Sequence, residues 1–306
     1  MGVQVLLSSY NGEKYISAQI ESILAQSYQD VSLLIRDDGS EDATLMYIEK
    51  FAEKYKGKIR YFAGSNIGAK QSFFELMRLA DPNCLYYAFC DQDDIWLKDK
   101  LLNAVTALNN EEHNQPLLYF TPTLLTDENL TQTKVWPLLL DVRPTFFNAL
   151  AENIVVGTTA VFNNNARKLM ILGNVDFKNV IMHDWWSYLC ISAFGQVLYD
   201  KEPSVLYRQH QENLIGGNRN SLELLKRKLK SFSENKGKRA LYKQALEFKN
   251  CYGDRMSGEM KKQLEMFVAP RENITTKLQY LKKSKLYRHS LSENTLLKLL
   301  ILSGYI

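Results

Sequence analysis

The sequence predicts an α/β fold with a mainly parallel sheet flanked by helices, followed by a helical and basic C-terminal extension. Three observations support this prediction. Apolar, β-rich runs alternate with helical segments four times in about the first hundred residues. The apolar runs are continuous, as in strands that are buried on both faces. Polar residues follow each run, where the carboxyl end of a parallel strand would lie.

The first four strand-and-helix units follow one another along the chain. Strands are expected in VQVLLSS (3–9), VSLLIRDDGS (31–40), IRYFAG (59–64) and LYYAFCDQDD (85–94). Helices are expected in ISAQIESILAQSY (16–28) and TLMYIEKFAEKY (44–55), and a loop followed by a helix is expected in SNIGAKQSFFELMRLA (65–80). Ile16, Ile20, Ile23 and Leu24 have the spacing of an amphipathic helix, and Ser40 is a candidate cap for the second helix.

The rest of the chain is less regular. It contains an expected strand NIVVGTTAVFN (153–163), a helix beginning near HDWWSYLCISAFG (183–195) and a strand EPSVLYRQH (202–210). The last 86 residues are predicted to form lysine-rich helices. We therefore expect an α/β domain over 1–220 and a helical, basic region over 221–306.

Composition argues against a disordered chain, a zinc site, a signal peptide and a transmembrane span. With 45% hydrophobic and 24% charged residues, the 306-residue chain is typical of globular proteins. Its four cysteines form no CxxC pair, which argues against a zinc site and favours reduced thiols. It lacks the features of a signal peptide and any apolar run of about 18 residues. We expect a cytoplasmic protein that is peripheral at the inner face of the cell membrane.

Charge is distributed unequally along the chain. Residues 221–306 hold 19 Lys and Arg against 8 Asp and Glu, a net of +11, whereas the preceding 220 residues hold 19 against 26, a net of −7. A basic helical region of this kind is typical of binding to an anionic membrane surface. The alternatives are an ordinary solvated helical domain and a contact in a homodimer.

Three carboxylates, Asp91, Asp93 and Asp94, end the fourth predicted strand. Carboxylate oxygens bind Mg²⁺ or Mn²⁺, and these ions keep positions open for substrate phosphates. A solvated turn before a helix is the alternative. Because the cluster follows a buried strand and lies beside other acids, we favour the cation site, with Asp94 as a possible helix cap.

Other candidates have structural alternatives. Asp37 and Asp38 can cap a helix or accept a hydrogen bond from the NH of a ligand such as a pyrimidine. Asp184 can be an N-terminal helix residue or a general base near Trp185. His210 can be structural or can serve a metal–diphosphate site. Gly157 can permit close backbone approach or mark a bulge.

The order of these motifs resembles glycosyltransferase family 2 with the GT-A fold, a Rossmann-like arrangement. The resemblance rests on SSYNGEKYI, SILAQSY, IRDDGSEDAT, NIGAKQSF, CDQDDIWLKDKL, GTTAVFN, HDWW and YRQH, which together span about residues 3–215. More narrowly, DQDDIW, HDWW and YRQH resemble bacterial rhamnosyltransferases of cell-wall or capsular polysaccharide synthesis.

The resemblance implies roles for individual residues. The implied nucleotide-sugar-binding residues are Ser9, Tyr10, Asn11, Asp38, Asn66, Gly68, Asp91 and Arg208. Asp93 and His210 match the metal ligands for Mn²⁺ or Mg²⁺, and Asp184 matches the catalytic base. The chain lacks the QxxRW motif of processive synthases, which implies addition of a single sugar, and it has His-Asp where Glu-Asp is usual.

The resemblance also implies the reaction and its partners. We expect inverting transfer of a sugar to a lipid-linked saccharide acceptor, with dTDP-rhamnose as donor and UDP-sugars as the alternative. A nucleotidyltransferase would show a Gly-rich basic loop where this chain has SSYNGEKY. A receiver domain would span only about 120 residues. The acidic catalytic part and the lack of a binding motif argue against a nucleic-acid partner.

Overall fold

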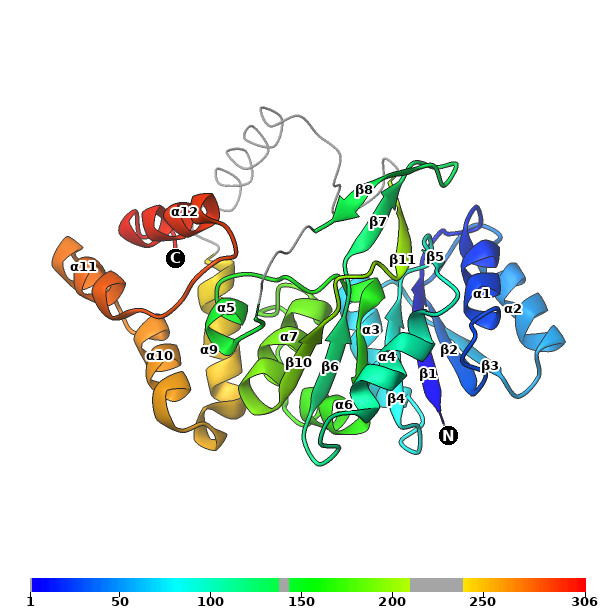
Figure 1. Ribbon diagram of the computed structural model, residues 1–306, viewed down its shortest axis with the longest axis horizontal. Helices are drawn as coiled ribbons and strands as arrows, with labels where there is room; N and C mark the ends of the chain where they lie inside the picture. Colours follow the sequence, from blue (N-terminus) through cyan, green and yellow to red (C-terminus); the bar gives the residue numbers. More distant parts are fainter. Residues whose placement is uncertain (1, 138–142, 210–238) are drawn as a thin grey trace.

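The computed structural model describes residues 2–137, 143–209 and 239–306, which form a seven-stranded sheet, a four-stranded sheet and surrounding helices (Figure 1). The large sheet has the order β10-β6-β9-β4-β1-β2-β3. Its strands are β1 (Val3–Ser9), β2 (Val31–Asp37), β3 (Ile59–Ala63), β4 (Tyr86–Cys90), β6 (Leu117–Phe120), β9 (Val161–Asn163) and β10 (Gln196–Tyr199). Only β9 pairs antiparallel within this described sheet, so the predicted α/β class with a mainly parallel sheet is confirmed.

The smaller sheet begins directly after the predicted acidic cluster. It has the order β5-β11-β7-β8 and comprises β5 (Ile95–Trp96), β7 (Thr123–Thr126), β8 (Gln132–Trp136) and β11 (Val205–Arg208). Strand β11 pairs antiparallel with β5 and parallel with β7. This sheet lies beyond the carboxyl ends of β1 and β4 (Figure 1), so it can form a wall over the end of the large sheet.

Helices cover both faces of the large sheet. The helices are α1 (Ile16–Leu24), α2 (Thr44–Lys54), α3 (Ala69–Leu79), α4 (Lys100–Asn109), α5 (Phe146–Ala149), α6 (Asn164–Ile171), α7 (His183–Phe194), α9 (Ala240–Tyr252), α10 (Gly258–Val268), α11 (Ile274–Lys283) and α12 (Leu291–Leu302). Alternation along β1 explains the two cores: Leu6 belongs to one hydrophobic cluster, whereas Val5 and Leu7 belong to the other. Both faces are therefore buried, as the continuous apolar runs predict.

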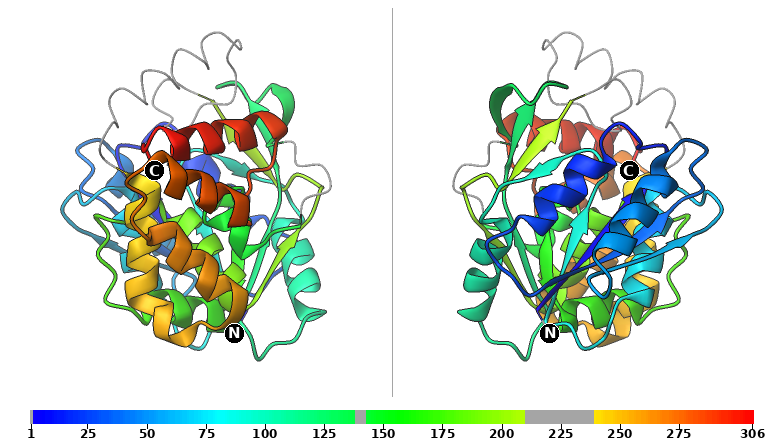
Figure 2. Two further views of the ribbon diagram at one scale, coloured as in Figure 1. Left: turned by 90° about the vertical axis from the view of Figure 1, so that its left-hand side faces the viewer. Right: turned by 90° about the vertical axis from the view of Figure 1, so that its right-hand side faces the viewer.

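The C-terminal helices share a core with the sheet domain. Phe248 of α9 packs edge-on against Trp186 of α7 at 5.9 Å between ring centroids, and Leu264 and Leu297 belong to the same buried cluster as Phe89. Figure 2 shows these helices at the opposite end of the molecule from α1 and α2. The boundary expected at residue 220 lies outside the described residues.

Three local predictions are wrong. Segment 153–163 is not one strand, because Gly157–Thr159 forms a short 3₁₀ helix, η1, and only β9 is extended. Ser40 does not cap α2, which begins at Thr44 with no side-chain cap. Asp94 does not cap the next helix, because α4 begins at Lys100. In the last two cases the side chains instead bond within the turn after β2 and to strand β11, as described below.

No helix in the described parts of the chain is both long and apolar enough to span a bilayer.

The second 3₁₀ helix, η2 (Gly253–Arg255), joins α9 to α10.

Candidate active site

Two cavities lie side by side at the carboxyl end of the large sheet. The first has a volume of about 510 Å³ and is lined by Ser8, Ser9, Tyr10, Asn11, Asp38, Asn66, Gly68, Ala69, Phe73, Asp91, Gln92, Asp93 and Tyr207. We call it the polar cavity. It brings together eight of the predicted site residues, which are Ser9, Tyr10, Asn11, Asp38, Asn66, Gly68, Asp91 and Asp93.

The second cavity has a volume of about 580 Å³ and a mostly apolar lining, and we call it the apolar cavity. It contains the predicted base Asp184, beside Ile154, Val155 and Trp185. Ala69, Asp91 and Tyr207 line both cavities, so the two spaces adjoin there.

The loop after β1 is tied to the predicted metal motif by Gln92. The Gln92 side chain accepts a hydrogen bond from the Tyr10 N–H at 2.8 Å and donates one to the Tyr10 carbonyl at 2.9 Å. Asn11 has a left-handed φ of 47°, and its side chain accepts a hydrogen bond from the Glu41 N–H at 2.9 Å. These contacts fix the loop, while the Tyr10 side chain remains 44% exposed at the cavity.

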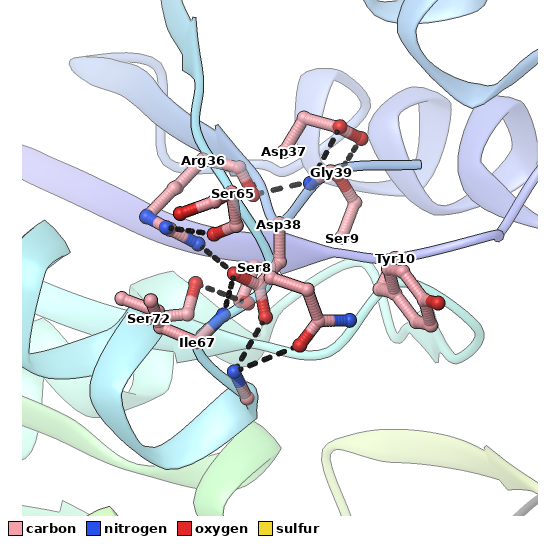
Figure 3. A network of polar contacts seen from close by, with 12 residues as sticks. Ser8, Ser9, Tyr10, Arg36, Asp37, Asp38, Gly39, Ser65, Ile67 and Ser72 are labelled. Carbon is pink, nitrogen blue, oxygen red and sulfur yellow. Dashed lines mark hydrogen bonds and ion pairs between the residues drawn. The ribbon is translucent and has the colours of Figure 1, made fainter. Parts of the chain in front are cut away.

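The paired acids at the carboxyl end of β2 have different surroundings (Figure 3). Asp37 closes the turn after the strand, accepting hydrogen bonds from the Ser40 N–H at 2.8 Å and the Ser40 hydroxyl at 2.6 Å. Asp38 forms a buried ion pair with Arg36 and accepts a hydrogen bond from the Gly68 N–H at 2.8 Å. Asp38 therefore holds the loop before α3 and also lines the polar cavity.

Carboxylates crowd the junction between the cavities. Burial raises the pKa of Asp91 to about 7, and the charges of Asp93 and Asp184 add to the effect. Burial also raises the pKa of Asp94 well above its ordinary value, with further contributions from Asp93 and Asp91. The Asp94 carboxylate accepts a hydrogen bond from the Arg208 N–H at 3.2 Å, which joins the acidic turn to β11.

Arg208 holds the same turn through its side chain. Its Nε donates to the Asp93 carbonyl at 2.9 Å, its Nη1 donates to the Glu128 carbonyl, and its guanidinium lies 4.7 Å from the centre of the Tyr15 ring. Arg208 is not among the described residues that line the two cavities. Its visible contacts are those of a residue that positions Asp93.

Asp184 lies in the first turn of α7, in the wall of the apolar cavity. Burial raises its pKa to about 6, while a hydrogen bond from the Trp185 N–H at 2.6 Å opposes the shift. A carboxylate with a pKa near 6 is mostly ionised at neutral pH yet basic enough to accept a proton during a reaction.

His183 is a neutral packing residue beside this carboxylate. Its ring stacks on Phe73 at 3.9 Å and meets the edge of Phe89 at 4.8 Å between centroids. Neither ring nitrogen has a hydrogen-bond partner in the described chain, and burial lowers the pKa of His183 to about 3. A Cβ at Gly157 would lie 3.0 Å from its Nε2 and 3.5 Å from Asp184 Oδ2, so the glycine permits close approach.

The residues at the junction fit a hard divalent cation in their chemistry. Asp91 and Asp93 offer oxygen ligands, and the mutual repulsion of three carboxylates there is the kind that a bound cation relieves. Residues 2–137, 143–209 and 239–306 contain no group of three or more His, Cys, Asp or Glu side chains arranged to hold a metal alone. The predicted ligand His210 lies outside the described residues.

Several residues of the two cavities were missed by the sequence analysis. Gln92 lies between the two acids of the motif, and Tyr207 precedes Arg208, so both were within recognised segments. Glu152 and Arg288 also line the apolar cavity, although 136 residues separate them along the chain. No local pattern marks Arg288, because only the tertiary fold brings it to the cavity.

The mainly parallel sheet flanked by helices matches the fold of GT-A glycosyltransferase structures. The chain belongs to glycosyl transferase family 2, whose sequence profile matches residues 4–168. Both the predicted family and the predicted fold are thereby confirmed.

Two curated relatives have names that state a donor. The chain is 32% identical over 226 residues to dTDP-rhamnosyl transferase RfbG of Shigella flexneri, covering 69% of this chain and 74% of RfbG. It is 26% identical over 190 residues to UDP-Glc:alpha-D-GlcNAc-diphosphoundecaprenol beta-1,3-glucosyltransferase WfgD of Escherichia coli, covering 62% of this chain and 69% of WfgD.

Solved structures share the fold at low sequence identity. S. aureus TarS 1-349 in complex with UDP-GlcNAc has a TM-score of 0.61 at 15% identity, covering 100% of this chain and 80% of that one. The mannosyltransferase PcManGT from Pyrobaculum calidifontis, in complex with GDP-Man and Mn²⁺, has a TM-score of 0.51 at 15% identity, covering 99% and 81%.

Proposed function

We propose that this chain is an inverting, metal-dependent glycosyltransferase that moves L-rhamnose from dTDP-rhamnose to a hydroxyl of a lipid-linked or growing polysaccharide acceptor. One observation carries the proposal. Asp91 lies where the polar cavity meets the apolar cavity, and Asp184 lies in the wall of the second. A donor bound in the first space can thus present its sugar to an acceptor in the second.

The nucleotide occupies the polar cavity in this proposal. Ser9, Tyr10, Asn11, Asp38, Asn66, Gly68 and Asp91 line that cavity and would contact the base, ribose and diphosphate. Both thymine and uracil carry an imide NH, and a carboxylate such as that of Asp38 can accept a hydrogen bond from it. Arg208 is the further proposed diphosphate contact, and its hold on the Asp93 carbonyl would also position the metal motif.

Asp184 acts as the general base. Its carboxylate takes the proton of the acceptor hydroxyl as that oxygen bonds to the anomeric carbon, and the bond to the diphosphate oxygen breaks. Attack from the face opposite the diphosphate inverts the configuration. Asp91, Asp93 and His210 are the proposed residues around a Mn²⁺ or Mg²⁺ ion, which when bound neutralises charge on the departing diphosphate.

The choice of donor sugar is supported by the relatives. RfbG is named as a dTDP-rhamnosyl transferase and is 32% identical to this chain, which supports dTDP-rhamnose. The 26% identity to WfgD, whose name gives UDP-Glc as donor, supports a UDP-sugar as the second candidate.

The test is a panel of dTDP-rhamnose, UDP-glucose, UDP-galactose and UDP-N-acetylglucosamine, each with Mn²⁺, with Mg²⁺ or with EDTA. We expect release of dTDP from dTDP-rhamnose that depends on the added cation. Release of UDP from one of the other donors, with none from dTDP-rhamnose, would establish the second candidate. Equal release with EDTA would contradict metal dependence.

The C-terminal region is proposed to meet an anionic membrane surface. Leu291 and Leu299 of α12 are 87% and 57% exposed, and the region is rich in lysine. Exposed leucines among lysines suit an interface between water and anionic lipid. Sedimentation with anionic but not neutral vesicles is expected at low salt. A concentration-dependent dimer without vesicle binding would favour the alternative of a contact between two copies.

A further inference from the structure

The far wall of the apolar cavity comes from the C-terminal region. Arg288, between α11 and α12, and Glu293, in the first turn of α12, both line the cavity that contains Asp184. Arg288 Nε donates a hydrogen bond to the Ala151 carbonyl at 3.0 Å, and its Nη1 pairs with Glu293 Oε2 at 3.1 Å. Their side chains are only 15% and 26% exposed, so this wall is built into the fold.

The segment that carries Arg288 is fixed to the sheet domain by its neighbours. Glu152 Oε2 accepts hydrogen bonds from the His289 N–H at 2.6 Å and from the Asn148 side chain at 3.2 Å. The Asn148 side chain also donates to the Tyr287 carbonyl at 3.2 Å. This network holds Arg288 in place before any ligand binds, which lowers the entropy cost of binding.

Aromatic side chains form another part of the lining. Trp136, Trp185 and Tyr207 all line the cavity, and the Trp136 and Tyr207 rings lie 6.1 Å apart at 34°. The Trp185 ring is held by a hydrogen bond from its Nε1 to the Ala149 carbonyl at 2.7 Å. A sugar ring has apolar C–H faces that pack on aromatic rings, and its equatorial hydroxyls point outward from the edge of the ring.

The charges of the lining select against an anionic occupant. Among the described residues, the lining holds four acidic side chains (Asp91, Glu152, Asp184 and Glu293) and one guanidinium, that of Arg288. Carboxylates accept hydrogen bonds from hydroxyls, whereas they repel a phosphate or a sugar carboxylate. Arg288 adds a donor for a hydroxyl or ring oxygen. A neutral, polyhydroxylated ligand with an apolar face fits all three features.

We propose that the apolar cavity binds an uncharged sugar ring of the acceptor and that Arg288 is a specificity-determining residue there. This inference rests on the proposed transferase function, because it names the acceptor class of the same site. It adds that the C-terminal region takes part in substrate recognition.

Saturation-transfer NMR tests the inference without turnover. The probes are allyl glycosides of neutral hexoses and allyl glucuronide, each with the full chain in the presence of dTDP and Mn²⁺. We expect saturation of the ring protons of at least one neutral glycoside. The glucuronide should bind at least about tenfold more weakly, and Arg288→Met should weaken neutral binding by about the same factor. Arg288→Lys, which keeps the charge, should recover part of it.

Arg271→Met is the matched control. Arg271 is also a half-buried arginine of the C-terminal region, and it donates to the carbonyls of Met266 at 3.0 Å and Phe267 at 2.6 Å. It lines neither cavity, so its loss should leave glycoside binding unchanged. If Arg288→Met fails to fold, Arg288→Lys and the comparison of charged with neutral probes decide the question.

Equal or tighter binding of the glucuronide, no signal from any neutral glycoside, or wild-type binding in the folded Arg288 variants would overturn the inference. Failure of the proposed function has a different signature, which is no release of nucleoside diphosphate from any donor. The binding experiment remains decisive in that case because it requires no reaction.

Discussion

The two cavities share a border at Asp91 but are built in different ways. Within the described chain, the polar cavity is lined by the end of β1, by the loops that follow β1, β2, β3 and β4 and by the start of α3, all within residues 8–93, and by Tyr207. The apolar cavity takes its walls from η1, α7, β8 and the segment before α12, which are separated by up to about half of the chain. The proposed donor side is thus local in sequence, and the proposed acceptor side is an assembly of distant segments.

The largest expected effect separates chemistry from donor binding. Asp184→Asn keeps the size of the side chain but removes the proton acceptor, so transfer should fall by about 10²–10⁴-fold. Binding of dTDP in the polar cavity, measured by calorimetry, should change by less than about twofold, since Asp184 does not line that cavity. Retained transfer in a folded Asp184→Asn protein would show that another group is the base.

Gly12→Ala tests the opposite side of the border. An added Cβ would lie 2.2 Å from Gln92 Oε1, so it should break the two hydrogen bonds between Gln92 and Tyr10. Loss of two such bonds costs about 1–3 kcal/mol, which predicts about fivefold or more weaker dTDP binding. The control is Ala52→Ser in α2. A glycine control such as Gly57→Ala is unsuitable, because Gly57 has a left-handed φ of 84° that alanine rarely adopts.

An unchanged affinity for dTDP in Gly12→Ala would mean that the loop after β1 does not contact the nucleotide. A larger effect on acceptor binding than on dTDP binding would contradict the proposal that the polar cavity binds the nucleotide and the apolar cavity binds the acceptor.

The pH dependence should come from the apolar side. With the pKa of Asp184 raised to about 6, the ionised and active form predominates above that pH. The rate of transfer should therefore fall about tenfold per pH unit as pH drops below about 6, and level off above it. This profile is measured at saturating donor and Mn²⁺, and Asp184→Asn should lose this acidic limb. A wild-type limb that survives in the variant would assign the titration to another group.

The smallest effect concerns Lys100, which lines neither cavity. Its Nζ is buried, lies 4.2 Å from the centre of the Trp96 ring and donates to the Thr159 carbonyl at 3.2 Å. Burial lowers its pKa to about 7. Between about pH 7 and 10.5 the unfolded chain binds more protons at this site than the folded chain, so its contribution to stability rises with pH across that range.

Lys100→Met removes this titration. The melting temperature of the variant, relative to wild type, should be highest at pH 7 and below and should decline as the pH rises toward 10. A constant difference across that range would indicate that the Lys100 ammonium stays charged in the folded protein.

The sequence predicted most residues of the polar cavity, because they lie at or after the ends of strands whose apolar runs are easy to recognise. Asp38 and Asp91, for example, occupy the carboxyl ends of β2 and β4, and the order of strands in a parallel sheet makes such ends converge. What the residues do locally was harder to predict. Ser40 matched the chemistry of a helix cap, but its hydroxyl binds Asp37 instead.

Apart from Asp91, which lines both cavities, Asp184 is the one predicted site residue among the described residues of the apolar cavity, and a recognised motif marked it. Segment 153–163 has the composition of a strand, yet Gly157 lies against His183 and the chain turns into η1 there. Tertiary packing overrides local propensity in this segment. Arg288 has no local signal at all, since its position depends on how the segment before α12 packs on Glu152 and its neighbours.

The ion pair between Arg36 and Asp38 has a consequence for ligand capture. Residues 1–220 carry a net charge of −7, and a nucleoside diphosphate is itself an anion. Arg36 balances the charge of Asp38 from within the protein. The wall of the polar cavity that contains Asp38 therefore keeps a hydrogen-bond acceptor, but it adds little negative potential to repel an approaching anion. In the proposed function, Asp38 thereby offers a carboxylate to the base of the donor, while the acidic protein still admits the attached phosphates.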